Sequence, residues 1–295
     1  MFIRKSPIAG SWYPSSATAL ADAVDGHLMA ADANDRSPES ELVGELVAIL
    51  APHAGLMYSG PVAAHAYRLL RDRRFEVAVL VGPSHFAGFD GVAVVPEGGF
   101  ETPLGIAAID EGCAADLRGV TPVVHDDRNV HSREHSLEMQ LPFLQRVAPA
   151  AKIVPLLMGY QTAETADALG GALATVLAGR RALVVASTDL SHYHDAVAAA
   201  RLDAVVLDCV RRFDADALQA ALDERPEHAC GGGPAVAVMR AAKSSGARDA
   251  IVLAYADSGD VTGDKSAVVG YMAAAFGNFT KNRTTEVTET KGGHG

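Results

Sequence analysis

Three histidines follow three short apolar segments of the chain, each close to the point where the segment gives way to turn residues. The pairs of segment and histidine are 45–51 with His53, 76–81 with His85, and 182–187 with His192. Segments this short and this rich in Val, Ile and Leu are typical of strands that are covered on both faces. Ligands of an open α/β sheet bind beyond the carboxyl ends of its strands, so we expect the three side chains to converge. Such a cluster could bind a metal ion or carry out acid–base chemistry.

Cys230 adds a second kind of side chain that can bind metal. It lies in the segment HACGGGP, directly before a helical pattern that begins at Pro234. The N–H groups and positive dipole end of a helix favour a thiolate, which is a nucleophile or a metal ligand. The alternative is a small buried residue beside a glycine turn. Cys113 and Cys209 fall within helical patterns, and we expect both in the core.

Three segments resemble familiar functional motifs, and each is set aside for a stated reason. Residues 259–266 (GDVTGDKS) resemble a phosphate-binding loop, but their spacing differs from that motif. The turn around Ser84 lacks the second glycine of a nucleophile elbow, so Ser84 is interpreted as a turn residue. Residues 131–135 (HSREH) match the inverted zinc-protease pattern, which needs a helix that the preceding residues do not support.

The composition argues against several classes of partner. The chain has 25 basic and 36 acidic residues, a formal net charge of -11, whereas binding to nucleic acid or an anionic membrane requires clustered Lys and Arg. No stretch approaches the roughly 20 apolar residues that span a bilayer, and we identify no signal peptide. The sparse set of 3 cysteines suits the reducing cytoplasm, which we predict as the location.

Helical and strand patterns alternate along the chain, which predicts one α/β domain with a mainly parallel sheet flanked by helices on both faces. The predicted helices are 17–29, 62–70, 137–147, 163–177, 196–210, 215–222 and 234–242. The predicted strands are 45–51, 76–81, 91–95, 152–158, 182–187, 249–255 and 267–274. We expect the domain to span residues 1–279, with a polar surface loop at 31–41 and a disordered tail at 280–295.

Six ordered sequence blocks resemble the Memo family, whose prokaryotic members are called AmmeMemoRadiSam system protein B. The blocks are PIAGSWYP (7–14), APHAG (51–55), GPSH (82–85), EHSLEMQLP (134–142), STDLSH (187–192) and CG (230–231). The resemblance covers about residues 5–277. It implies a fold shared with class III extradiol dioxygenases, which are non-haem iron enzymes, and a site at the carboxyl ends of the strands.

Carried over residue by residue, the resemblance assigns metal binding to His53, His85 and Cys230. His192 corresponds to the family's site histidine, the counterpart of the dioxygenase acid/base, with Asp189 in the same block. The implied metal is iron(II), with copper or zinc as alternatives. A cysteine stands where the dioxygenases have a carboxylate, and because a thiolate is softer and can be oxidised, extradiol cleavage is placed in doubt.

Four other residues in or next to these blocks have open roles. His135 and Glu138 lie three residues apart on a predicted helix, and either could face the site or support it from behind. His194 could line the pocket. Trp12, the only tryptophan, could cover the mouth of the pocket or act as a structural plug.

Three functions remain open at this point. The chain could be a Memo-type iron protein with a redox or oxygenase-like role, working with the Ammecr-type and radical SAM proteins that the family name links to it. It could instead be a non-haem iron dioxygenase that acts on an unidentified small molecule. A metal-free module that recognises a peptide or partner protein is the third alternative.

Overall fold

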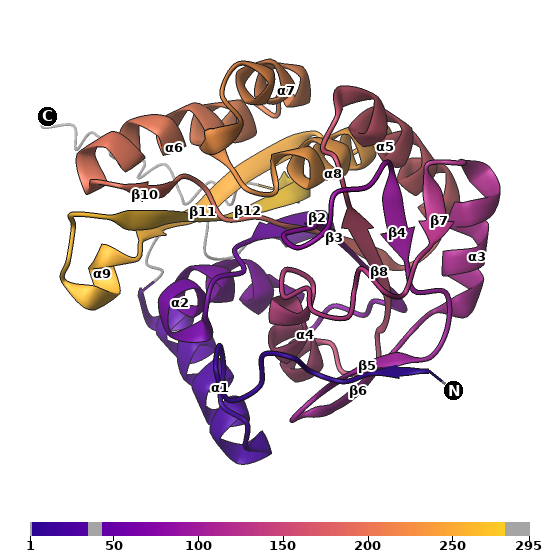
Figure 1. The fold of residues 1–295 in the computed structure, drawn as a ribbon, viewed down its shortest axis with the longest axis horizontal. Coiled ribbons are helices and arrows are strands. Elements are labelled where there is room, and N and C mark those ends of the chain that lie inside the picture. The colour runs from indigo at the N-terminus through magenta and orange to yellow at the C-terminus, as the bar shows by residue number, and fades with distance from the viewer. Residues whose placement is uncertain (1, 35–42, 281–295) are drawn as a thin grey trace, which may run out of the picture.

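A nine-stranded mixed sheet runs through the molecule (Figure 1). The structure is a computed structural model that describes residues 2–34 and 43–280. Its strands run in the order β10-β12-β2-β9-β3-β8-β4-β7, and β11 pairs with β12. The strands are β2 (Val43–Ala51), β3 (Val77–Pro83), β4 (Val92–Val94), β7 (Val124–Asp126), β8 (Lys152–Met158), β9 (Ala182–Ser187), β10 (His192–His194), β11 (Asp249–Asp257) and β12 (Val268–Thr280).

The middle of the sheet is parallel, and antiparallel pairs extend it on both sides. Strands β2, β9, β3 and β8 run parallel to one another. Strand β12 is antiparallel to β2 and also pairs with β10 and β11, while β4 is antiparallel to β8. The predicted α/β class is confirmed. The strands that precede the three histidines of the sequence analysis, β2, β3 and β9, all belong to the parallel part of the sheet.

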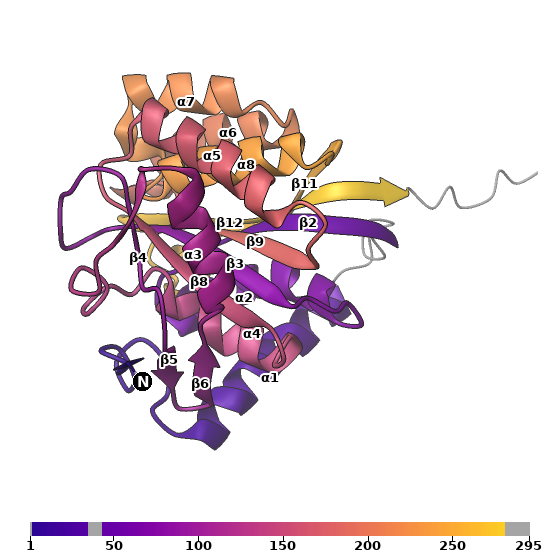
Figure 2. The ribbon, with the colours of Figure 1, turned by 90° about the vertical axis from the view of Figure 1, so that its right-hand side faces the viewer.

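Helices cover both faces of the sheet (Figure 2). They are α1 (Ala17–Asn34), α2 (Leu56–Tyr67), α3 (Glu111–Val120), α4 (Leu141–Val147), α5 (Ala163–Leu177), α6 (Ala196–Arg211), α7 (Ala215–Glu224), α8 (Gly232–Ser244) and the short α9 (Gly259–Thr262). Helices α1, α2 and α4 pack on one face, and α3 and α5 to α8 pack on the other. None of the helices in the described part of the chain is long and apolar enough to cross a membrane.

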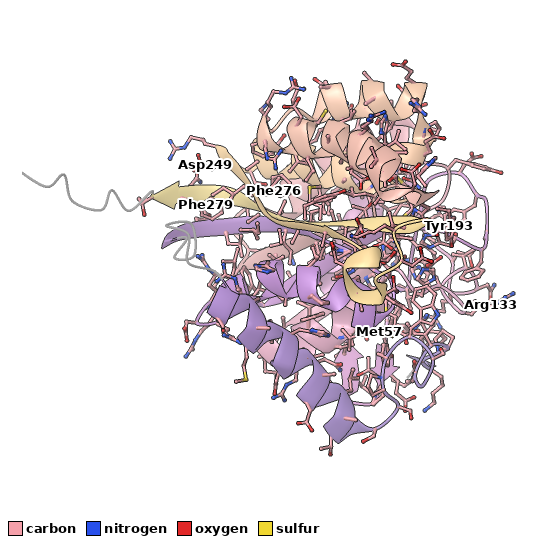
Figure 3. All side chains as sticks on the ribbon, turned by 90° about the vertical axis from the view of Figure 1, so that its left-hand side faces the viewer. Met57, Arg133, Tyr193, Asp249, Phe276 and Phe279 are labelled. Carbon is pink, nitrogen blue, oxygen red and sulfur yellow. The ribbon has the colours of Figure 1, made fainter. Side chains whose placement is uncertain are left out.

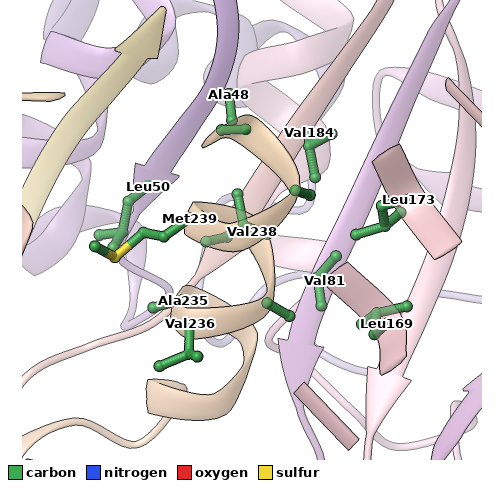
Figure 4. Close-up of a cluster of buried hydrophobic side chains, with 14 of the residues drawn as sticks. Ala48, Leu50, Val81, Leu169, Leu173, Val184, Ala235, Val236, Val238 and Met239 are labelled. Atoms are coloured by element: carbon green, nitrogen blue, oxygen red, sulfur yellow. The ribbon is translucent and has the colours of Figure 1, made fainter. Parts of the chain in front are cut away.

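Strand β3 shows why both faces are covered. Val77, Val79 and Val81 belong to the apolar cluster under α8, and the alternate residues Ala78 and Leu80 belong to the cluster on the opposite face. Successive side chains of a strand point to opposite faces, so a continuous apolar run needs a cover on each side. Figure 4 shows the α8 side of this packing, where Val81, Val184 and Met239 lie among the buried side chains.

Several elements differ from the sequence prediction. Helix α2 begins six residues before the predicted residue 62, and Pro61, which interrupts the helical hydrogen-bond pattern, lies inside it. Residues 138–140 form a 3-10 turn before α4, so the predicted helix 137–147 is only partly α-helical. Helix α3 is missing from the predicted helices, although Cys113 was assigned to a helical pattern, because the two glycines of its sequence EGCAADLRGV lower the helix propensity.

A small second sheet ties the N-terminus to the body of the protein. Strand β1 (Ile3–Arg4) pairs in parallel with β5 (Gly99–Thr102), which forms a hairpin with β6 (Gly105–Ala108). These strands, like β7 and β10, are too short to show a clear periodicity and were not predicted. The predicted tail at 280–295 lies outside the described residues except for Thr280, which belongs to β12. The predicted loop at 31–41 is wrong for residues 31–34, which form the end of α1, and its remaining residues lie outside the described part of the chain.

Candidate metal centre

His53, His85 and Cys230 come together at the carboxyl ends of the parallel strands. His53 follows β2 and His85 follows β3, and both strands run parallel to β9 between them. Cys230 comes just before α8. One ligand atom from each of the three residues lies within 4.8 Å of the other two. The structure therefore brings together the three residues predicted to bind metal, drawn from segments up to 177 positions apart.

The geometry of the cluster is compact. The rings of His53 and His85 have centroids 5.1 Å apart and planes at 79° to one another. Cys230 Sγ lies 3.2 Å from His53 Nε2. His53 is 2% exposed, while the His85 side chain is 27% exposed, so the cluster has a buried wall and an accessible one.

Glu134 orients His85. Its Oε1 lies 2.9 Å from His85 Nδ1, and its Oε2 accepts a hydrogen bond of 2.6 Å from the His85 backbone N–H. Oε1 also accepts the backbone N–H groups of His135 and Ser136 at 2.8 and 2.9 Å. Burial alone would raise the pKa of Glu134, but these hydrogen bonds and the nearby imidazole hold that pKa well below its usual range. An ionised Glu134 can only accept, so His85 donates from Nδ1 and leaves Nε2 free for a metal.

Asp189 supports the opposite side of the cluster. Its Oδ1 accepts the backbone N–H of His53 at 2.7 Å, and its own backbone N–H donates to Cys230 Sγ at 3.3 Å. Burial raises the pKa of the Asp189 carboxyl to about 7, although the N–H groups of His53 and Ala54 lower it in part. The Asp189 carboxylate thus holds the segment that carries His53.

The Cys230 thiol has a different protonation preference from the one expected at a helix N-terminus. Burial raises its pKa, and the charge of Asp189 raises it further. These effects outweigh the hydrogen bonds from the Asp189 N–H and the Thr188 side chain, which lower the pKa. The predicted stabilisation of a thiolate by α8 alone is therefore wrong, and a bound cation would have to displace the thiol proton.

His192 lies at the start of β10, close enough to interact electrostatically with both His53 and His85. Burial lowers its pKa. A β-bulge separates it from His194 in the pairing with β12, and the intervening Tyr193 has φ 63° and is 79% exposed. Figure 3 shows Tyr193 and Arg133 at one end of the molecule, while Phe279, near the end of β12, lies at the opposite end.

His135 and Trp12 form the wall beside His85. The His135 ring stacks on His85 with centroids 4.4 Å apart, and the Trp12 ring packs against His135 with centroids 4.2 Å apart. Trp12 is 36% exposed, so it lies at the margin of the site. Burial lowers the pKa of His135 to about 4, which keeps this ring neutral at physiological pH.

Glu138 does not share the site with His135. The segment 131–136 is not helical, and Glu138 is fully buried in an ion pair with Arg4. Of the two roles left open, His135 therefore lies beside the cluster and Glu138 supports it from behind, without a shared helix face. His131 of the H-x-x-E-H pattern is buried, with Nε2 3.1 Å from the carbonyl of Ala93, so the inverted zinc-protease arrangement is also absent from these residues.

Three supporting residues were not identified from the sequence. Glu134 orients His85, and Ser187 and Gln140 form a buried network behind His53. All three lie in the sequence blocks quoted above. A polar residue within an apolar strand end, such as Ser187, was the available signal, because buried polar groups require partners.

Comparisons with known proteins agree with this architecture. A family model described as Memo-like protein matches residues 4–275. A MEMO1 family protein of Methanosarcina mazei is 38% identical over 276 residues, which cover 92% of this chain and 98% of the relative. A MEMO1 family protein of Nitrosopumilus maritimus is 33% identical over 277 residues, covering 93% of this chain and 99% of the relative.

A solved structure resembles the fold. The crystal structure of an uncharacterized protein from Escherichia coli K12 superposes with a TM-score of 0.55 and 15% identity, over 79% of this chain and 100% of that chain. At this identity the likeness shows the fold alone.

Proposed function

The chain belongs to the Memo family, and from this premise we propose that it binds one metal ion through His53, His85 and Cys230. The observation that carries the proposal is the approach of one ligand atom from each residue to within 4.8 Å of the others. Both histidines also have a partner on Nδ1, which leaves Nε2 available as the ligand atom.

The donor set narrows the choice of metal. Two imidazoles and one thiolate suit iron, copper and zinc, and they do not suit magnesium or calcium, which prefer oxygen ligands. We take iron(II) as the first candidate, with copper and zinc as alternatives. When bound, such an ion would supply a Lewis-acidic and, for iron or copper, redox-active centre.

The residues around the centre have distinct tasks in this proposal. Glu134 and Ser187 hold the two histidine rings, and Asp189 holds the backbone beside His53. His192 is the acid/base group, because it is a histidine near the cluster that takes no part in the ligand set and can exchange a proton with a bound molecule.

Metal analysis tests the ligand assignment. The protein is purified anaerobically, loaded with iron(II), and measured by elemental analysis beside a zinc-loaded sample. His53→Ala and His85→Ala should each abolish stoichiometric binding without unfolding the protein, while the control His125→Ala should bind as the unaltered chain does. Full occupancy in the His53→Ala, His85→Ala double variant would place the site elsewhere, and no binding by the unaltered chain would favour a metal-free binding module.

A second measurement tests the role of His192. His192→Ala should keep the metal affinity of the unaltered chain and lose any turnover. Oxygen uptake with catechols by the iron-loaded protein would favour the alternative function, a dioxygenase acting on a small molecule. Loss of metal from His192→Ala would make His192 a ligand and contradict the assignment.

We further propose, from the family resemblance, that the chain acts in a redox or oxygenase-like step beside an Ammecr-type protein and a radical SAM protein. Co-purification of the three proteins after co-expression tests this association, and their separation during gel filtration at micromolar concentration would contradict it.

A further inference from the structure

A buried chain of hydrogen bonds runs from Tyr67 to the ring of His53. The Tyr67 hydroxyl donates to Gln140 Oε1 at 2.8 Å, and Gln140 Nε2 donates to Ser187 Oγ at 2.8 Å. Ser187 Oγ lies 2.9 Å from His53 Nδ1. Tyr67, Gln140 and Ser187 have no exposed surface, and His53 is 2% exposed. Polar atoms buried in this way must find their partners within the protein.

The single proton of the Ser187 hydroxyl has a defined acceptor. Ser187 Oγ lies 2.7 Å from the backbone carbonyl oxygen of Ser136, which can only accept. A hydroxyl that turned its proton toward His53 would leave two oxygen atoms in contact with no hydrogen between them. Gln140 offers Ser187 only a donor, because its amide oxygen already accepts from Tyr67 and its nitrogen also donates to the Pro52 carbonyl at 3.1 Å.

These contacts determine which nitrogen of His53 carries the proton. Ser187 Oγ donates to Ser136, accepts from Gln140, and has one lone pair left for His53, so His53 Nδ1 must donate to it. The proton is then absent from Nε2, the nitrogen that faces Cys230 Sγ 3.2 Å away. We propose that Ser187, held by Gln140 and Tyr67, is a positioning residue that keeps His53 in the Nδ1–H tautomer and so presents Nε2 to a metal.

The inference rests on the proposed metal site and deepens it. His85 reaches the same tautomer through a carboxylate, Glu134, whereas His53 reaches it through a neutral hydroxyl. The other tautomer of His53 would direct an N–H at the cation. Removal of a hydrogen-bond partner behind a metal-binding histidine weakens metal affinity by about 10- to 100-fold. We expect a loss of that size when the Ser187 hydroxyl is removed.

Nitrogen-15 NMR of the unaltered chain, prepared without metal, tests the tautomer directly. Long-range ¹H–¹⁵N spectra of histidine-labelled protein distinguish a protonated Nδ1 from a protonated Nε2, and the His53 signals are identified by their loss in His53→Gln. A protonated Nδ1 is expected. A protonated Nε2 overturns the proposal, and the spectrum can be read even if the chain binds no metal, so failure of the metal site and failure of this inference remain distinguishable.

Ser187→Ala tests the role of the hydroxyl, with Ser59→Ala as the matched control. Ser59 is also buried, and its hydroxyl also donates to a backbone carbonyl, that of Ala54 at 2.7 Å. Zinc affinity, measured by competition with a chromophoric chelator, should fall about 10- to 100-fold in Ser187→Ala and remain unchanged in Ser59→Ala. In the same variant the Nε2–H tautomer of His53 should become visible. Equal affinities in the two variants, or an unchanged His53 tautomer in Ser187→Ala, overturn the proposal; if Ser187→Ala does not fold, the spectrum of the unaltered chain decides alone.

Discussion

Replacing Glu138 with glutamine tests whether a buried ion pair holds the segment that delivers Glu134 to the metal centre. Glu138 is fully buried and pairs with Arg4, whose side chain is 3% exposed. The carboxylate also accepts the Tyr13 hydroxyl at 2.6 Å. The guanidinium donates further to the backbone carbonyls of His131, at 2.6 Å, and of Glu134. Arg4 therefore connects the N-terminal strand to both ends of the segment 131–138.

The size of the effect follows from the burial of the pair. Removal of one partner of a buried ion pair costs about 3–5 kcal/mol, since the remaining charge is left in a medium of low dielectric constant. Glutamine keeps one acceptor oxygen for Tyr13, so we expect Glu138→Gln to lower the free energy of unfolding by about 3 kcal/mol, near the lower limit of this range. Domains have a free energy of unfolding of about 5–15 kcal/mol, so the loss is a large fraction of the total.

Urea unfolding without added metal measures this loss and excludes stabilisation by a bound ligand. The control is Glu76→Gln, since Glu76 pairs with Arg181 on the surface, where the two side chains are 60% and 62% exposed. A surface pair contributes about 0–1 kcal/mol. The double variant Arg4→Met, Glu138→Leu should regain part of the loss, because it leaves no unpaired charge. Equal destabilisation by Glu138→Gln and Glu76→Gln would refute the reasoning.

Three further outcomes are expected. Air exposure of the iron-loaded protein should release iron and add oxygen to the partly exposed Cys230. The buried Cys113 and Cys209 should stay unmodified, as measured by peptide mass spectrometry. Gly270→Ala should destabilise the protein by about 1–3 kcal/mol in a thermal melt, because the added Cβ would lie 2.0 Å from the buried Asp203 carboxylate. The control Gly119→Ala should be neutral or stabilising, because its added Cβ meets nothing within 4 Å. Burial lowers the pKa of His131 to about 4. The stability that this neutral ring contributes is therefore complete above the unfolded pKa of about 6.5 and is lost as the pH falls toward 4. His131→Gln should reduce that acid destabilisation by up to about 3 kcal/mol, as measured by urea titrations at several pH values.

The outcome that would contradict each of these is specific. Equal oxidation of all three cysteines would show that the thiol at the metal centre is not the vulnerable one. Equal melting temperatures of the two glycine variants would mean that the strand can move away from α6 without cost. Identical acid destabilisation with and without the His131 ring would assign it to other groups.

Long periodic elements were predicted best from the sequence. Helix α5 was predicted at its observed bounds, and β9 likewise, since each has an apolar pattern that matches its geometry and is bounded by turn residues. The three-residue strands β4, β7 and β10 hold too few side chains to reveal a period, and only β4 was predicted. The antiparallel partners of the sheet depend on contacts between distant segments, which local patterns do not report.

The residues of the candidate site also differ in whether local sequence patterns could predict them. His53 and His85 could be found because each follows a strand, and strand ends in a parallel sheet meet at one edge. The roles of Glu134 and Ser187 could not be found in that way, because their partners lie 49 and 134 positions away in the chain. The protonation preference of Cys230 also escaped the sequence argument, because burial, which only the folded structure reveals, outweighs the helix end.

The position of β12 has a consequence for how the protein is made. This strand, the last described in the chain, pairs with both β11 and β2, so it lies inside the sheet. Until residues 268–280 have left the ribosome, β2 presents an open edge to other chains, and an unpaired edge is a template for aggregation. The pairing of Ala274 with Leu50 closes a loop of more than two hundred residues, and long loops slow folding. A nascent chain that stalls before β12 should therefore depend on chaperones, although every residue of the metal centre has by then been synthesised.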